Sequence, residues 1–176
     1  LTAGLQTLFV EETLDGLYRC EMSFENWGPT DSGEIGTLYD DFRVLGFGKT
    51  LAVRAGDGDT EAQIFQGRIT ALEAQFPQNR PPEMIALAED RFQDLRMIRR
   101  TRSFEDVSDR DVVSTIASDH GLQADASLDG PTHKVLTQVN QSDLAFLRER
   151  ARAVGAEVWV EDKKLLAKKR DSRRAQ

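Results

Sequence analysis

The residues that most often carry out chemistry are few in this chain and widely spaced. The only histidines are His120 and His133, and the only cysteine is Cys20. A zinc site uses several Cys or His ligands at close spacing, and the chain has no paired Cys or His-x-x-x-His. A serine, a histidine and an aspartate could still meet in the fold, but no nucleophile-elbow motif supports a hydrolase. We therefore expect no metal site and assign no catalytic residue.

Two short segments resemble ligand-binding motifs, and each lacks a required residue. Gly48-Lys49-Thr50 matches the end of a phosphate-binding loop, but Arg43 stands where the motif has its first glycine. The motif also needs a helix to follow, whereas Leu51-Ala52-Val53 is typical of an extended segment. Asp57-Gly-Asp59-Thr-Glu61 lacks the glycine and the distant glutamate of a calcium loop. We expect a hairpin turn there and no cofactor.

The composition is that of an ordinary globular protein. The chain has 176 residues, of which 39% are hydrophobic and 30% charged, enough for one substantial core or two small ones. No stretch approaches the ~18 apolar residues that span a bilayer, and no basic-then-apolar leader opens the sequence. One cysteine cannot form an internal disulfide and fits a reducing compartment. These features argue against stable membrane insertion, a disulfide scaffold and a fibrous rod.

Charge is unevenly distributed along the chain. The formal net charge of −7 argues against specific nucleic-acid binding through the phosphate backbone. Residues 1–162 hold 16 basic and 29 acidic residues, whereas residues 163–176 hold 7 basic and 1 acidic. This basic end either docks on an anionic neighbour or is a solvated strand end that runs into the terminus.

The first hundred residues are typical of strands separated by turns. Apolar runs and period-two alternation predict strands at 5–10, 16–24, 42–48, 50–55, 62–76 and 84–88. Turns are expected at 15–16 and 56–59, with a loop over 26–36. Gly46 and Gly48 indicate a bulge or kink between two strand pieces. Short strands at this spacing favour a barrel or sandwich of antiparallel neighbours.

From residue 102 onward the hydrophobic period changes to that of helices. One helix is expected to start at Ser108 and to end at Gly121, and a second ends at Gly155. We expect Ser108 with Asp111, and Asn140 with Asp143, to cap the two helices. His120 falls in the last helical turn and His133 in a loop. Residues 156–160 form a strand that pairs with 163–169.

These patterns predict an α+β fold in two domains. Residues 1–97 form a mainly antiparallel β barrel-like tube domain. Residues 98–170 form a small α+β domain with two helices and a terminal hairpin, and 171–176 form a basic tail.

Four segments, in their order and spacing, resemble one known family. The segments carry these motif residues: Gly48, Phe65, Gly67, Asp90, Arg102, Phe104, Asp111, Gly121, Gln138, Asn140, Ser142, Asp143, Phe146, Leu147 and Gly155. The most specific segment is Gln138-Val-Asn140-Gln-Ser142-Asp143-Leu144-Ala-Phe146-Leu147. Together they resemble the phage late control gene D family, which includes tail baseplate hubs and the hub part of type VI secretion spikes (VgrG).

This resemblance implies a structural protein, not an enzyme. Members of the family are similar in fold to tail-tube subunits, and three copies join a sixfold tail tube to a threefold spike. The implied partners are therefore two further copies, a tail-tube protein and a spike protein or domain. The implied location is a phage virion tail or a contractile injection apparatus assembled in the bacterial cytoplasm. Family hubs usually continue for a further stretch, so the resemblance implies a fragment or a short relative.

A second function class is a cell-wall glycan-binding module. The order strand, helix, helix, strand from about residue 99 to 169 loosely resembles LysM domains. Aromatic residues that could stack on sugars are few: Trp159 lies on a predicted strand, and Trp27, Tyr18 and Tyr39 lie in the first domain. The sequence thus indicates no sugar-stacking platform.

Overall fold

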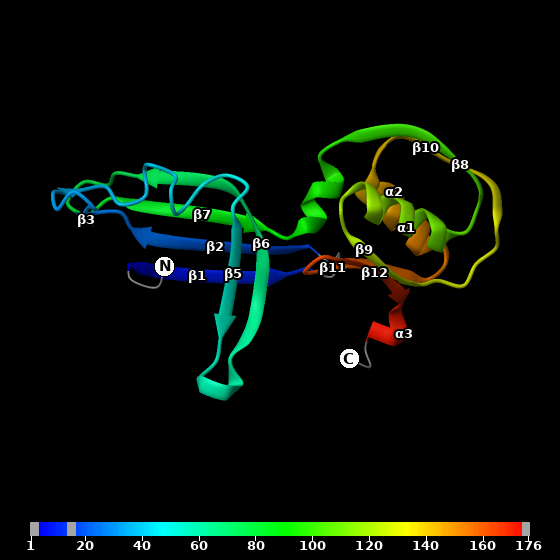
Figure 1. Ribbon diagram of the computed structural model, residues 1–176, viewed down its shortest axis with the longest axis horizontal. Coiled ribbons are helices and arrows are strands. Elements are labelled where there is room, and N and C mark those ends of the chain that lie inside the picture. Colours follow the sequence, from blue (N-terminus) through cyan, green and yellow to red (C-terminus); the bar gives the residue numbers. More distant parts are fainter. Residues whose placement is uncertain (1–3, 14–16, 174–176) are drawn as a thin grey trace. The chain divides into compact units, whose positions relative to one another are not determined.

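The computed structural model describes residues 4–13 and 17–173. The chain divides into two compact units, one of Leu1–Glu12 with Tyr18–Asp90 and one of Thr13–Leu17 with Arg91–Gln176. The predicted turn at residues 15–16 lies outside the described residues. The two units are described one at a time below (Figure 1).

The first unit is built on one antiparallel sheet. Its five strands are β1 (Leu5–Glu12), β2 (Tyr18–Glu25), β5 (Thr50–Ala55), β6 (Ala62–Gln75) and β7 (Glu83–Glu89). They lie in the order β1-β2-β7-β6-β5, with every neighbouring pair antiparallel. The mainly antiparallel, barrel-like character expected from the sequence is confirmed.

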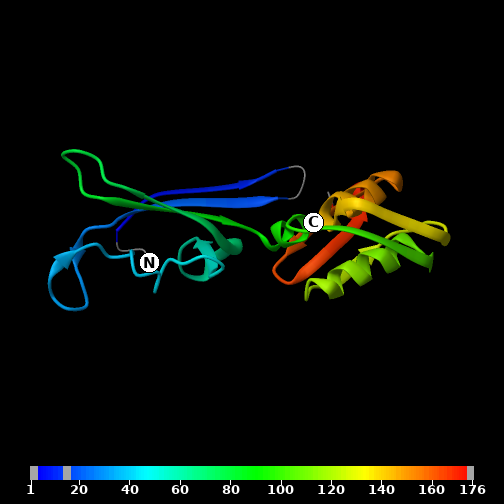
Figure 2. The ribbon, with the colours of Figure 1, turned by 90° about the horizontal axis from the view of Figure 1, so that it is seen from above.

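The long strand β6 curls this sheet into a half-barrel (Figures 1 and 2). Its first part pairs with β5, and its second part, from Arg68, pairs with β7 through a bulge between Ile69 and Ala71. Gly67 lies where the strand passes from one neighbour to the other. A Cβ there would stand 2.6 Å from Phe65 Cζ and would overlap the Glu89 carbonyl, so the curl requires a glycine.

An irregular segment crosses between β2 and β5, and here two expectations were wrong. Residues 42–48 form turns and bends, not a strand, and the expected loop contains the short pair β3 (Gly28–Pro29) and β4 (Ile35–Gly36). The side chain of buried Asn26 anchors the segment, since its Oδ1 accepts from the amides of Leu38 and Tyr39. An apolar run looks like a strand in sequence, but residues 42–48 form no strand ladder, and the Gly48 amide donates to the Ile69 carbonyl.

Two helices form the centre of the second unit. Its elements are the 3₁₀ segment η2 (Arg91–Arg96), β8 (Arg99–Val107), α1 (Asp109–Asp119), β9 (Gln123–Ser127), β10 (His133–Ser142), α2 (Asp143–Ala153), β11 (Ala156–Glu161), β12 (Lys164–Lys169) and α3 (Arg170–Arg173). The helices α1 and α2 contact the three-stranded sheet β11-β12-β9 and also the two-stranded ribbon of β8 and β10 (Figures 1 and 2).

The expected helices and terminal hairpin are confirmed in this unit. Strands β11 and β12 pair from Ala156 with Lys169 to Glu161 with Lys164. The β8–β10 ribbon was not predicted, and His133 begins β10, not a loop. The basic strand end is partly neutralised locally, because Lys168 and Lys169 each lie 3.0 Å from a carboxylate, Asp125 and Asp129. For these two lysines, the contacts favour the interpretation of a strand end over docking on an anionic neighbour.

Each unit has its own hydrophobic core. In the first, Phe24, Phe65 and Ile69 are among the buried side chains that line the concave half-barrel. In the second, Ile116 and Leu147 are among the side chains packed between the helices and the sheet.

We predict that Gly67→Ala destabilises the protein by about 1–3 kcal/mol, the usual cost of overpacking. The added methyl overlaps the Glu89 carbonyl, and the strand cannot move away without losing its ladder. Urea denaturation measures the effect. Gly36→Ala is the matched control, because its Cβ would meet only the Thr30 methyl at 3.4 Å. Equal stability of the two variants would contradict the close approach at Gly67.

A second prediction concerns the thiol of Cys20, which is buried on β2. Burial raises the pKa of the Cys20 thiol from 9.0 to about 11, so the reactive thiolate is scarce at neutral pH. We expect the native protein to react with a thiol reagent such as DTNB only as fast as it opens. Addition of urea above the unfolding midpoint should give rapid reaction of one thiol per chain. Rapid reaction without denaturant would contradict the burial.

Candidate functional site

The two central helices of the second unit, α1 and α2, each begin with a buried aspartate. Asp109 is the first residue of α1 and Asp143 the first of α2, and each side chain is only 1% exposed. A carboxylate at a helix N-terminus is favoured by the helix dipole. Burying a charge is costly unless it is paired and hydrogen bonded. Both aspartates therefore need cationic or hydrogen-bonding partners from other elements.

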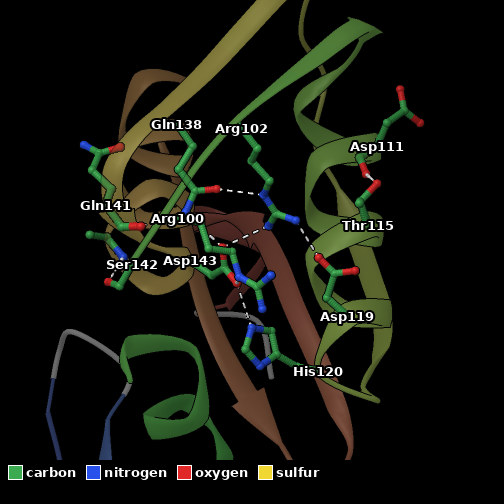
Figure 3. A network of polar contacts seen from close by, with 11 residues as sticks. Arg100, Arg102, Asp111, Thr115, Asp119, His120, Gln138, Gln141, Ser142 and Asp143 are labelled. Carbon is green, nitrogen blue, oxygen red and sulfur yellow. Dashed lines mark hydrogen bonds and ion pairs between the residues drawn. The ribbon is translucent and has the colours of Figure 1, made fainter. Parts of the chain in front are cut away.

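Asp143 is surrounded by partners from β8, β10 and the end of α1 (Figure 3). Its Oδ1 accepts from Gln138 Nε2 and from Arg102 Nη2, both at 2.9 Å. Its Oδ2 lies 2.8 Å from His120 Nε2 and 3.2 Å from Arg100 Nε. Both carboxylate oxygens are thus held by positive or donor groups.

Arg102 joins this carboxylate to the rest of the unit. Its Nε donates to Gln138 Oε1 at 2.9 Å, and its Nη1 lies 2.6 Å from Asp119 Oδ2 on α1 (Figure 3). The guanidinium also lies over the Phe104 ring, 4.8 Å from its centre. Because Arg102 and Gln138 are direct partners in the β8–β10 ladder, the strand register itself places both side chains. The residue therefore ties the ribbon to both helices.

Asp109 has a similar set of partners at the other end of the helix pair. Arg150 of α2 donates to it through Nε at 2.7 Å and Nη2 at 3.3 Å, and His133 Nε2 lies 3.6 Å away. The start of α1 is thus bonded to α2, while the start of α2 is bonded to His120 at the end of α1. The two helices therefore run antiparallel and are cross-linked at both ends.

These contacts keep Asp143 ionised. Burial alone would raise the pKa of this carboxyl, but hydrogen bonds from Gln138 and His120, with the charges of Arg102 and Arg100, lower it below its usual range. A general acid at neutral pH needs a raised pKa, and a general base needs a free lone pair facing a substrate. The arrangement at Asp143 offers neither, and its chemistry is that of a structural ion-pair network.

The described residues also bring no other reactive set together. Within 4–13 and 17–173, no three His, Cys, Asp or Glu side chains gather closely enough to hold a metal ion. No serine or threonine hydroxyl in the same ranges hydrogen bonds to His120 or His133. No helix of the described chain is long and apolar enough to cross a bilayer. Trp159, weighed as a sugar-binding surface, is buried and donates to Glu161.

The helix caps agree with the sequence at one helix and differ at the other. Ser108 caps α1, with its hydroxyl accepting from the Asp111 amide and Asp111 accepting from the Ser108 amide. For α2 the cap is Ser142, which accepts from the Ala145 amide at 3.2 Å, so the cap predicted at Asn140 is wrong. Asn140 instead takes a positive φ of 47° in the β10 bulge between Gln138 and Gln141. The extra bulge residue moves the start of the helix two positions along the chain.

The other motif residues are buried in the two cores or lie at helix ends and turns. Phe146 and Leu147 are buried in the second core, where Phe146 stacks on Phe104 at 5.8 Å. Gly121 and Gly155 end the two helices with positive φ, as C-terminal glycines do. In the first unit Phe65 is in the core, Gly48 has a φ of +74° and Gly67 lies at the strand crossing. Asp90 is buried, and its Oδ2 accepts from the Tyr18 amide at 3.2 Å.

Sequence reasoning missed six members of the two networks: Arg100, Asp109, Asp119, His120, His133 and Arg150. The only local signal was the placement of Asp109 beside a cap and of His120 at a helix end. These residues lie 17 to 43 positions from their partners, so no short motif contains both members of a pair.

The sequence comparisons assign a family. The family described as Alg8 N-terminal domain matches residues 40–176. The description of this family names an N-terminal domain and states no activity. No curated protein sequence matches the chain significantly. The matched family is not the late control gene D family, so that resemblance stays a prediction.

The solved structures similar to this chain include tail proteins. One is a 43 kDa tail protein of prophage MuSo2 from Shewanella oneidensis, with a TM-score of 0.68 and 12% identity over 93% of this chain and 49% of the other. A second is the E. coli c3393 protein, a type VI secretion component described as structurally similar to T4 tail proteins gp27 and gp5 (TM-score 0.64, 13% identity, 95% and 46% covered). A third is a tail protein from Neisseria meningitidis MC58 (TM-score 0.62, 13% identity, 90% and 44% covered). The chain thus shares their fold and spans about half of their length.

We predict that Asp143→Asn destabilises the protein by about 3–5 kcal/mol at pH 7, since it leaves Arg100 and Arg102 without their buried counter-charge. The pKa of Asp143 is lower in the folded than in the unfolded state, so its stabilisation is fully present above about pH 3.9 and is lost as pH falls through the folded pKa. The difference in the free energy of unfolding between wild type and variant should therefore become smaller below pH 4.

Urea unfolding from pH 7 to pH 2.5 measures this difference. Asp129→Asn is the control, because its pair with Lys169 is exposed and is expected to contribute less than about 1 kcal/mol. A difference for Asp143→Asn that stays constant down to pH 2.5 would contradict the lowered pKa.

Proposed function

The chain belongs to the Alg8 N-terminal domain family, and from the fold that it shares with tail proteins we propose that it is a structural subunit of a phage tail or a contractile injection machine. Its specific role is that of a baseplate hub or spike base, which adapts a sixfold tail tube to a threefold spike. It acts as a homotrimer that binds a tail-tube protein and a spike protein. It is assembled in the bacterial cytoplasm and catalyses no reaction.

The observation that carries this proposal is the extent of the shared fold. Two tail proteins and one type VI secretion component match 90–95% of the chain, so the likeness includes both compact units and is not limited to one common motif. We take the units as two domains, a tube domain and a small hub domain. A likeness of this extent to proteins described as tail components favours an assembly role.

The buried networks support the same role. Asp109 and Asp143, which would be the most obvious acids for chemistry, are fully used in joining α1, α2 and the β8–β10 ribbon. Such cross-links hold a small domain in one shape. A subunit that matches two symmetries needs fixed surfaces more than a reactive pocket.

The proposal predicts a defined assembly of the full-length protein. We expect it to form trimers, and to bind tail-tube and spike proteins encoded next to it in a ratio of three hub chains to three spike chains. Light scattering after size-exclusion chromatography measures the mass, and tube protein from an unrelated phage is the control. A full-length protein that stays monomeric with cognate tube and spike proteins present would contradict the hub role.

A further inference from the structure

Three apolar side chains are displayed together on the irregular segment of the first unit. Phe42, Val44 and Phe47 are 51%, 46% and 66% exposed, and the two rings lie 6.2 Å apart. We call these three residues the aromatic tip. Isolated exposed apolar residues are common, but a cluster of aromatic rings on one loop is typical of interaction sites.

The loop that carries the aromatic tip is firmly held. Phe42 has a φ of 57°, which is rare for a bulky residue and persists only where the surroundings enforce it. Leu45, between the exposed residues, is completely buried. Lys49 Nζ donates to the Arg43 carbonyl, and a Cβ at Gly46 would lie 2.9 Å from the Phe42 carbonyl. Because the tip is already ordered, little conformational entropy is lost when it binds.

The surroundings of the aromatic tip are acidic. A cavity of about 450 Å³ lies beside it, and its lining includes Asp31, Asp40, Asp41, Arg43 and Val44. Arg43 is the only basic residue of that lining, at 3.7 Å from Asp31 and 3.2 Å from Asp41. The tip therefore combines aromatic rings with three aspartates, against two basic residues, Arg43 and Lys49, and it suits a basic partner surface.

A surface of that kind exists on the second unit of the same chain. A hollow of about 80 Å³ there is lined by three arginines, one glutamate and three small apolar side chains that are themselves buried. Its lining comprises Arg148, Ala151, Arg152, Ala156, Glu157, Val158 and Arg170. Glu157 is the only acidic residue of the lining and lies 2.9 Å from Arg170 Nε. We call this surface the arginine hollow.

We propose that the aromatic tip of one copy docks on the arginine hollow of a second copy. The contact rests on the proposed assembly role, since it is a head-to-tail contact between identical subunits. A phenyl ring placed among guanidinium groups gains cation–π attraction, and the acidic rim of the tip faces the arginines. The net charge of −7 for the whole chain disfavours an anionic membrane or nucleic acid as the partner of the hollow.

A head-to-tail contact leaves one tip and one hollow free on every dimer. It therefore extends to a ring if the rotation closes and to a chain if it does not. The same property gives a specific test, because a copy that lacks the tip still has a hollow, and a copy that lacks the hollow still has a tip.

The test uses the whole chain with Phe47→Ser as the tip variant and Arg152→Glu as the hollow variant. Sedimentation over a range of protein concentrations should show self-association of the wild type. Each variant alone should associate at least tenfold more weakly. An equimolar mixture of the two variants should form a 1:1 dimer and nothing larger, because only one intact contact is present.

Matched controls separate this result from general effects of the substitutions. Phe76→Ser removes a ring that is equally exposed, at 66%, and Arg110→Glu reverses an exposed arginine on α1, so both should associate like the wild type. Circular dichroism confirms that each variant is folded. A monomeric wild type, variants that associate normally, or a mixture that stays monomeric would each overturn the docking. None of these results removes the hub role, which depends on the stoichiometry with tube and spike proteins.

Discussion

The second unit depends on one constraint, which is that a buried carboxylate must have its charge balanced. Asp143 starts α2 inside the unit, and water is not available to stabilise it there. Arg102 from β8, Gln138 from β10 and His120 from the end of α1 each supply a part of the required balance. Strands β8 and β10 and the end of α1 must therefore meet at the start of α2, and this meeting fixes the direction of the two helices. The pair of Asp109 and Arg150 applies the same constraint at the opposite end.

The curled shape of the first unit is determined by a steric constraint and not by charge. Strand β6 serves two neighbours in turn, and it can do so only because Gly67 allows the Glu89 carbonyl to approach. The resulting curl encloses a core of residues such as Phe24 and Phe65 on the concave face. The two units thus reach a fixed shape by different means, one through close backbone packing and the other through ion pairs that join its elements.

Local rules predicted the parts of this fold that local interactions decide. The helix at 109–119 was found because Ser108 and Asp111 lie three residues apart and bond each other, and the β11–β12 hairpin because its strands are adjacent in the chain. The β8–β10 ribbon was missed because Arg100 and Arg102 face inward, where a hydrophobic pattern is expected. The cap at Asn140 was wrong because a bulge, which is set by the pairing of β10 with β8, moves the helix start to Ser142. The network itself spans distant positions, so no spacing rule could have indicated it.

The aromatic tip and the arginine hollow both lie outside the contacts that fix the two units. Inside the second unit, each buried acid has its cations, so the arginines at the arginine hollow are not required for the balance of Asp109 or Asp143. In the first unit, Asn26 and Leu45 hold the irregular segment, so Phe42 and Phe47 are not needed in the core. The aromatic rings thus stay exposed at the first surface, and at the second Arg148 lies over the Phe92 ring and Arg170 pairs with Glu157. The opposite charges of the two surfaces are the basis of the docking that we propose between two copies.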